Sequence, residues 1–354
     1  MNSQALMKSI IQRVATGPDL SKDISFEEAR EGMQAILRGE IDDVQSAIFL
    51  IALRMKRESM EENEGILAAI IAQSDEQQVN VEHLVDLGDP YSGYNRSIPV
   101  SSFLPPLLAE LGLPTVVHGL ESVSPKFGLT HRHINQALGL DADCSTAQAK
   151  KRLEDPSVAW SYIDQASYCK GLHNLVPLRN RLIKRTVINT VETLIGPLRG
   201  ENTHSILGYV HKPYPPIYAR LADFSGMDSS LLVRGVEGGV VPSLRQKGLM
   251  ISYQGITEQD RVDIDPKALG VEQELRAIAF PDGLSVENND IEALANYTVE
   301  LGKSALSGEK GMFYDGLVLS ASLILWHTKK ANSLAEAAEM TRAVLDSGKA
   351  LSRL

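Results

Sequence analysis

The character of the chain changes near residue 80, and this change limits the folds that it can adopt. The first 75 residues carry apolar side chains at helical spacing, with Gly39 separating two of the segments. After residue 80, short apolar runs bounded by glycine or proline alternate with helical patterns, as in domains with a mainly parallel sheet. We therefore predict an α/β fold, with a small all-helical domain over residues 1–75 and a larger α/β domain over residues 80–354.

Two capping patterns mark helix starts in the N-terminal region. Ser25-Phe-Glu-Glu28 and Ser59-Met-Glu-Glu62 each place a hydroxyl three residues before a glutamate and ahead of an apolar stripe. Between them, Val44, Ile48 and Ile51 lie at helical spacing. Helices this short are marginal alone, so their stripes must pack on one another or on a partner subunit. Because two-fold dimers are the commonest closed assembly, we predict a homodimer formed through the N-terminal helices.

Candidate strands and helices alternate in the second region. Apolar runs predict strands over Leu84–Leu87, Thr115–Val117 and Ser230–Val236. Helical patterns predict helices over Phe103–Leu111, His131–Leu138 and Ala147–Leu153. From Asn289 onward the chain returns to helix, with a capping pattern at Ser333-Leu-Ala-Glu336.

Composition restricts the class and location of the protein. Of its 354 residues, 43% are hydrophobic and 23% charged, as in ordinary globular proteins. The sequence contains no apolar run near the ~20 residues needed to cross a bilayer, and polar residues interrupt Met1–Ala15, so it lacks a signal-peptide core. Two cysteines, Cys144 and Cys169, cannot form a disulfide framework. We expect a cytoplasmic protein with no membrane contact.

The net charge of −10 argues against a surface coated with phosphate-binding cations. It does not exclude a local basic groove, because the field of a cleft depends on the charges near it.

A predicted strand ending in His118 points to an anion site. The run Pro114-Thr-Val-Val-His118-Gly119 leads through a Ser122–Gly128 loop into a helical segment. A strand that delivers a histidine to a small-residue loop at a helix start commonly holds an anion. Lys126 in this loop is a candidate anion contact. The alternatives are a structural hydrogen-bonding role for His118 and a solvated Lys126.

Several segments resemble the anthranilate phosphoribosyltransferases. The N-terminal ones are Ile24–Ala29, Met33–Glu40 and Gln45–Lys56, and a weaker similarity continues through Pro177-Leu-Arg179, Arg185-Thr186, Asn189 and Gly196-Pro-Leu198. The resemblance implies that family's architecture, in which the N-terminal helices make the dimer contact and which the pyrimidine nucleoside phosphorylases share. We expect a helical segment within about 160–195 to complete the helical domain.

The resemblance also implies an activity, which is the transfer of a phosphoribosyl group to a small aromatic or heterocyclic acceptor. Arg179 would bind the acceptor's carboxylate, while Ser101, His118 and Lys126 would hold the sugar phosphate. Catalysis would rest on positioning and on stabilising an oxocarbenium-like sugar, so we assign no catalytic residue.

The first phosphate-binding loop of the family departs from its pattern here. The equivalent stretch is Gly88–Arg96, where Pro90 removes a backbone donor and two tyrosines add bulk. Ser97 and Ser101 match hydroxyl positions of the family. They are open to two interpretations, phosphate binding or simple helix capping.

The third loop of the family, which here contains Val240-Val241, departs further from the family's pattern. The family holds Mg²⁺ with an adjacent Asp-Glu pair, and this sequence has Val240-Val241 there, which offers no oxygen ligand. Glu237 supplies one carboxylate at most. In the second loop, His118, Gly119 and Lys126 fall on matching positions, but Leu120-Glu121 replaces an Asn-Arg pair. We expect no metal site, Mg²⁺ only if phosphoribosyl pyrophosphate is used, and no standard anthranilate activity.

The run Arg234–Gly238, with the altered first loop, resembles a divergent branch in which some members bind DNA as homodimers through a basic groove. A second hypothesis is therefore a non-catalytic protein that binds single-stranded nucleic acid, with bases stacked on Tyr91 or Tyr94. The phosphates would meet a basic cluster formed by Arg179, Arg181, Lys184 and Arg185. The alternative is that these are solvated charges on an exposed helix face. The candidate substrate and phosphate contacts are Ser97, Ser101, His118, Gly119, Lys126 and Arg179. The candidate anion or nucleic-acid contacts are Arg96, Arg181, Lys184, Arg185, Arg234 and Glu237.

Overall fold

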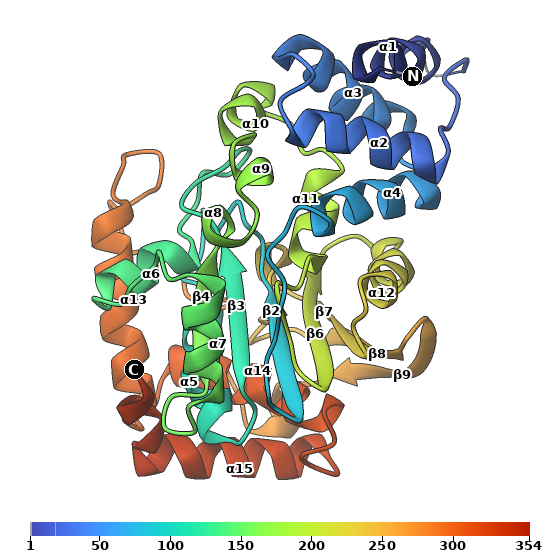
Figure 1. Cartoon of the computed structure of the whole chain (residues 1–354). Coiled ribbons are helices and arrows are strands. Elements are labelled where there is room, and N and C mark those ends of the chain that lie inside the picture. The colour runs from blue at the N-terminus through green and yellow to red at the C-terminus, as the bar shows by residue number, and fades with distance from the viewer. Residues whose placement is uncertain (1, 18) are drawn as a thin grey trace.

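The computed structural model describes residues 2–17 and 19–354 and has two parts (Figure 1). A group of helices from the N-terminus lies at one end of an α/β domain that is built on a seven-stranded, mostly parallel sheet. This arrangement confirms the predicted fold class. Across residues 2–17 and 19–354, no helix is both long enough and apolar enough to span a membrane.

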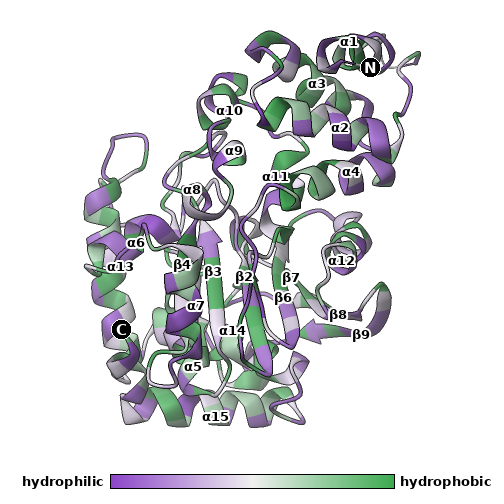
Figure 2. Ribbon diagram, in the orientation of Figure 1, coloured by the Kyte–Doolittle hydropathy of each residue, from purple (hydrophilic) through white to green (hydrophobic). Residues whose placement is uncertain are grey.

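The N-terminal helices are α1 (Ser3–Val14), α2 (Phe26–Leu37), α3 (Asp43–Lys56) and α4 (Met60–Ile71). Both predicted capping boxes are present, at Ser25 with Glu28 and at Ser59 with Glu62. Figure 2 shows hydrophobic and hydrophilic stretches alternating along these helices, as amphipathic helices require. Helices α2 and α4 pack closely at Gly65, where a Cβ atom would lie 2.4 Å from the carbonyl oxygen of Phe26.

Helix α3 buries only part of the wide apolar face that its sequence indicated. Phe49, Leu50 and Leu53 are fully buried in the bundle. Val44 and Ile48, which lie at helical spacing in the sequence, face outward instead, with 68% and 39% of their surface exposed. The second apolar stripe of α3 is therefore free for another surface.

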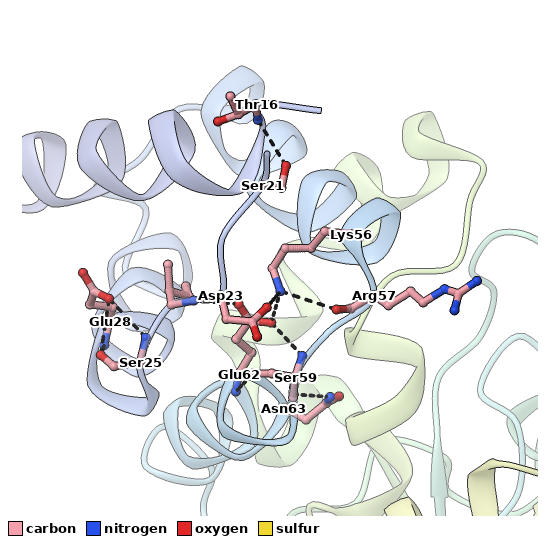
Figure 3. Close-up of polar contacts among 11 residues, drawn as sticks. Thr16, Ser21, Asp23, Ser25, Glu28, Lys56, Arg57, Ser59, Glu62 and Asn63 are labelled. Atoms are coloured by element: carbon pink, nitrogen blue, oxygen red, sulfur yellow. Dashed lines mark hydrogen bonds and ion pairs between the residues drawn. The ribbon is translucent and has the colours of Figure 1, made fainter. Parts of the chain in front are cut away.

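A buried cation fixes the link between α3 and α4 (Figure 3). The Nζ of Lys56 lies 2.6 Å from Glu62 and 2.5 Å from Asp23. Glu62 is fully buried and also accepts hydrogen bonds from the backbone N–H groups of Ile24 (2.9 Å) and Ser59 (2.8 Å). Burial lowers the pKa of Lys56, but the two carboxylates more than compensate, so its pKa lies above the ordinary value.

Short helices connect the bundle to the sheet. They are α8 (Gln165–Tyr168), α9 (Lys170–His173), α10 (Val176–Leu182), α11 (Ile188–Val191) and the 3-10 turn η2 (Glu192–Leu194). Arg181 of α10 forms an ion pair with Asp43 of α3. The helices begin only at Gln165, because residues 160–164 of the segment expected to be helical form a strand.

The main sheet has the strand order β4-β3-β2-β6-β7-β8-β9. Its parallel strands are β2 (His83–Gly88), β3 (Thr115–Gly119), β4 (Trp160–Asp164), β6 (Asn202–Tyr209) and β7 (Ser229–Arg234). Strands β8 (Gly248–Gln254) and β9 (Thr257–Ile264) continue the sheet in antiparallel fashion, so that β9 forms one edge and β4 the other. A separate parallel pair joins β1 (Gln77–Gln78) to β5 (Leu198–Arg199).

The three predicted strands are present as β2, β3 and β7, but β7 ends at Arg234. Val236 begins the 3-10 turn η3 (Val236–Gly238), in which Glu237 adopts a left-handed conformation with φ of 54°. Successive strand residues face opposite sides of the sheet. Val116 belongs to the core shared with the N-terminal bundle, and Val117 to the core beneath the C-terminal helices.

The remaining helices cover the sheet. They are η1 (Val100–Phe103), α5 (Leu104–Glu110), α6 (His131–Ala137), α7 (Thr146–Glu154), α12 (Tyr214–Phe224), η4 (Lys267–Leu269), α13 (Ile291–Leu306), α14 (Met312–His327), α15 (Leu334–Ser347) and η5 (Lys349–Arg353). Predicted helices over 103–111, 131–138 and 147–153 correspond to α5, α6 and α7. Ser333 caps α15 by accepting from the N–H of Glu336 (3.1 Å), as its capping pattern indicated.

Candidate functional site

A pocket lies between the carboxyl ends of the parallel strands and the helical bundle. Its cavity volume is about 120 Å³. The carboxyl edge of a parallel sheet is where α/β proteins commonly bind ligands, because loops and helix starts converge there. The wall of the pocket combines strand ends, the segment 185–193 and one residue of α3, namely Gly88, Gly208, Tyr209, Arg54, Arg185, Thr186, Asn189, Thr190, Glu192 and Thr193.

Aromatic and cationic side chains line the side of the pocket near α12. Tyr214 and Tyr218 lie one helical turn apart with ring centroids 5.5 Å from each other, and Tyr209 ends β6 beside them. The guanidinium of Arg54 lies 3.4 Å from the hydroxyl of Tyr214. Arg185 is exposed and lines the same pocket. Flat aromatic walls with cations at the rim suit a planar ligand that carries a negative group.

Arg179 does not reach this pocket as a free cation. Its side chain is 3% exposed, and its Nη2 donates to Glu192 Oε1 at 2.8 Å. The amide of Asn189 donates to the same oxygen at 3.3 Å. Glu192 lines the pocket, whereas Arg179 is not among its lining residues. The structure therefore gives no support to direct binding of an acceptor carboxylate by Arg179.

His118 is buried in a network of its own. Its Nε2 lies 2.9 Å from Asp86 Oδ1, and its Nδ1 is hydrogen-bonded to the hydroxyl of Tyr91, which in turn contacts the hydroxyl of Tyr168. The side chains of His118 and Asp86 are fully buried. With both ring nitrogens engaged, His118 positions Tyr91, a residue of the pocket wall. This geometry favours the structural alternative for His118.

Asp89 joins the first and third loops. It accepts hydrogen bonds from the Ser101 hydroxyl, from His131 Nε2 (2.9 Å), from the Tyr94 hydroxyl (3.0 Å) and from the backbone N–H of Val240 (2.9 Å). Burial raises the pKa of Asp89, but its hydrogen bonds, above all that from His131, hold it below the ordinary value. Ser101 is fully buried by this contact, so it lies away from the pocket.

Glu237 occupies a nest of donors in the first loop. Its carboxylate accepts from the Ser97 hydroxyl (2.8 Å), from the backbone N–H groups of Asn95 (3.2 Å) and Arg96 (3.1 Å), and from Lys126 (3.4 Å). Lys126 also donates to the Glu237 carbonyl at 2.9 Å. Burial lowers the pKa of Lys126, and the Glu237 carboxylate partly opposes this. Three predicted contacts, Ser97, Lys126 and Glu237, thus meet, but they bind one another.

The other predicted contacts are dispersed. The side chains of Lys184, Arg96 and Arg234 are exposed, as is that of Arg181, which bonds to Asp43. Gly119 ends β3, where an added Cβ would meet only ordinary contacts at 3.8 Å from Tyr162. Of the predicted substrate, phosphate and anion contacts, Arg185 and Glu237 are the two that line the pocket.

The structure contradicts the prediction that bases stack on Tyr91 or Tyr94. The two side chains are 3% and 4% exposed, and both hydroxyls are hydrogen-bonded inside the protein. Burial raises the pKa of both phenols well above the ordinary value. A polynucleotide cannot reach these rings. The partly buried rings of Tyr214 and Tyr218 are the accessible alternatives.

The third loop lacks the oxygen ligands of a magnesium site. Val240 is buried, and its backbone N–H is held by Asp89. Over the described residues, 2–17 and 19–354, no cluster of three or more histidine, cysteine, aspartate and glutamate side chains is arranged to hold a metal ion. The donor set here does not fit Mg²⁺, which prefers several carboxylate and phosphate oxygens.

Sequence reasoning missed Asp86, Asp89, Glu192 and the tyrosines of the pocket. Asp86 carried a signal, since it is a charged residue inside the apolar run of a buried strand and must have a partner there. The sequence gives no signal for Glu192, because the segment around it has no strong periodic pattern from which its position could be predicted.

The comparisons with known proteins agree with this architecture. A glycosyl transferase family model of a helical bundle domain matches residues 8–74, and the model of the family's a/b domain matches residues 92–351. The chain therefore belongs to this glycosyl transferase family.

Its relatives include enzymes of known name. An uncharacterized protein of Aquifex aeolicus is 28% identical over 332 residues, covering 94% of this chain and 96% of its own. The anthranilate phosphoribosyltransferase of Thermomicrobium roseum is 26% identical, covering 99% and 95%. Among solved structures, the Saccharomyces cerevisiae anthranilate phosphoribosyltransferase in complex with phosphoribosyl pyrophosphate and Mg aligns with a TM-score of 0.79 at 17% identity, covering 99% of this chain and 96% of that one. The Thermus thermophilus enzyme aligns with a TM-score of 0.73 at 20% identity, covering 98% and 95%.

Proposed function

We propose that this protein is a phosphoribosyltransferase-like transferase that acts on a small aromatic or heterocyclic acceptor and is not a standard anthranilate enzyme. The observation that carries the proposal is the pocket at the carboxyl ends of the parallel strands, with tyrosine walls and with Arg54 and Arg185 on its lining. Its relatives named as anthranilate phosphoribosyltransferases support the reaction class.

The altered loops support the departure from the anthranilate enzymes. Glu237 fills the donors of the first loop, and Val240-Val241 replaces the carboxylate pair. A sugar phosphate in the pocket would therefore meet Arg54 and Arg185 rather than the loop backbone. Catalysis would depend on holding donor and acceptor together and on stabilising positive charge on the sugar.

Binding of planar rings tests this proposal. Calorimetric titration with a panel of small aromatic and heterocyclic rings, with and without ribose 1-phosphate, should identify ligands. Their affinity should fall about tenfold or more in Tyr214→Ala and, for phosphorylated ligands, in Arg185→Ala. Glu201→Ala, an exposed change at the start of β6, is the control. Failure of every ring to bind, with the wild type folded, would contradict a small-molecule site.

We keep a second candidate, a homodimer that binds single-stranded nucleic acid. The observation that favours it is the exposed pair Lys184 and Arg185, of which Arg185 lines the pocket together with Arg54. Binding should then weaken steeply with salt, and Lys184→Ala with Arg185→Ala should reduce the salt slope by about two units. Single-stranded DNA that fails to bind even at low salt would eliminate this function.

A further inference from the structure

Glu192 is a buried carboxylate of the pocket wall, and the inference drawn from it rests on the acceptor site proposed above. Glu192 is 1% exposed and lines the pocket. One of its oxygens, Oε1, is taken by Arg179 (2.8 Å) and Asn189 (3.3 Å). The other, Oε2, has no hydrogen-bond partner within the described part of the chain, and we call it the free oxygen.

A second buried polar atom without a partner belongs to the same wall. Thr186 lines the pocket and is 3% exposed, and its hydroxyl has no partner among the residues that the structure describes. Its backbone N–H donates to Asn189 at 3.0 Å, so the hydroxyl and the carboxylate belong to one short, internally bonded segment. A buried carboxylate oxygen without a donor costs free energy, and a ligand that donates to it recovers that cost.

The charge of this wall disfavours an aromatic carboxylate. The guanidinium of Arg179 would attract such a group, but its charge is paired with Glu192 through Nη2, and Arg179 is not a lining residue of the pocket. Its Nη1, which has no partner among the described residues, is buried. An acceptor carboxylate would therefore approach the free oxygen of Glu192, and two like charges at short range repel each other strongly in a poorly solvated site.

We propose that Glu192 selects a planar ring that presents an amino or amidine N–H donor, in place of a ring carboxylate. The donor would bind the free oxygen of Glu192, and the hydroxyl of Thr186 would pair with a neighbouring polar atom of the ring. Tyr209, Tyr214 and Tyr218 line the same pocket and supply flat apolar surface for the ring. The pocket thus has the opposite polarity to a site that holds anthranilate by its carboxylate.

Two probes with the same ring test this polarity, 2-aminobenzamidine and 2-aminobenzoate. By calorimetry, the wild type should bind the amidine at least tenfold more tightly than the carboxylate. Glu192→Gln keeps an acceptor for Arg179 but removes the negative charge. It should weaken amidine binding tenfold to a hundredfold and, because Arg179 is then no longer neutralised, strengthen carboxylate binding.

Thr186→Val gives a second test that leaves the ion pair untouched. It should reduce amidine affinity severalfold while its thermal unfolding stays close to that of wild type, and Glu201→Gln on the exposed start of β6 should change neither. Wild type that prefers 2-aminobenzoate, or Glu192→Gln that alters neither affinity, would overturn the inference while leaving a ring-binding pocket. Failure of both probes to bind folded wild type and both variants would overturn the inference, and failure of the whole ring panel would overturn the proposed function as well.

Discussion

The hydroxyl of Ser97 donates to the carboxylate of Glu237 at 2.8 Å, across 140 residues of sequence. This bond joins the loop after β2 to the turn after β7. The backbone N–H groups of Asn95 and Arg96 and the ammonium of Lys126 converge on the same carboxylate. An internal anion therefore occupies donors of the kind that bind phosphate groups.

Removal of this carboxylate should create a pyrophosphate site. We expect wild type to show no Mg²⁺-dependent binding of phosphoribosyl pyrophosphate with the tightness of a working transferase. Glu237→Gly should gain at least tenfold in affinity for inorganic pyrophosphate, because glycine adopts the left-handed φ of 54° without strain and frees the donors. Calorimetry with and without Mg²⁺ measures both. Glu237→Gln, which still fills the nest, is the matched control, and micromolar Mg²⁺-dependent binding by wild type would contradict this account.

The Arg179–Glu192 pair should matter for stability. Both side chains are nearly fully buried, at 3% and 2% exposed. Arg179→Met leaves a buried carboxylate without its cation, which typically costs about 3–5 kcal/mol of unfolding free energy. Urea unfolding should show this loss, and the double variant Arg179→Met with Glu192→Leu should recover most of it. A loss below about 1 kcal/mol would mean that the pair is not buried as described.

The outward stripe of α3 predicts self-association. Val44, Ile48 and Met55 lie at helical spacing and are 68%, 39% and 76% exposed, and Ile183 on the neighbouring α10 segment is 63% exposed. Light scattering should give a dimer at micromolar concentration, and Val44→Asp with Met55→Glu should give a folded monomer. Leu275→Asp, which changes a similarly exposed leucine far from α3, should leave the dimer intact. A wild-type monomer would refute the prediction.

A chain of buried hydrogen bonds at the amino ends of the strands predicts pH-dependent stability. His204 bonds to His83 (3.0 Å) and Ser229 (2.7 Å), and Ser229 bonds to His327 (2.9 Å), which also contacts Ser252 (2.9 Å). Burial lowers the pKa of His204 to about 4 and that of His327 to about 3. Both rings are therefore neutral in the folded protein at pH 5.

The unfolded chain protonates these histidines near pH 6.5, so between about pH 6.5 and 4 it binds more protons than the folded chain. This stability is fully present above about pH 7 and is lost as the pH falls, by about 2 kcal/mol for each histidine at pH 5. Denaturant titrations at pH 7 and pH 5 measure the loss. His327→Gln should reduce it, whereas unchanged pH dependence in that variant would exclude His327 as a source.

The sequence predicted the parts of the fold that local chemistry determines. Ser25 and Glu28 lie in one turn, so their capping box can be recognised from four residues. The candidate site was harder, because its residues are defined by partners far along the chain. The loop sequence around Lys126 indicates an anion contact, and only the fold reveals that the anion is Glu237. Arg179 and Glu192 likewise lie on separate elements, so nothing local to either residue indicated that they neutralise each other.

Strand β9, one of the two edge strands of the sheet, has a consequence for the behaviour of the protein in solution. Strand β9 ends the hydrogen-bonded ladder, and an open edge of this kind can recruit the edge of another molecule and start aggregation. Its exposed side chains include Glu258, Arg261 and Asp263, whose charges must be dehydrated before a second strand can dock. This edge is thus protected against sheet extension, and the self-association predicted above would use the apolar helical surface, where the contact can be limited to two chains.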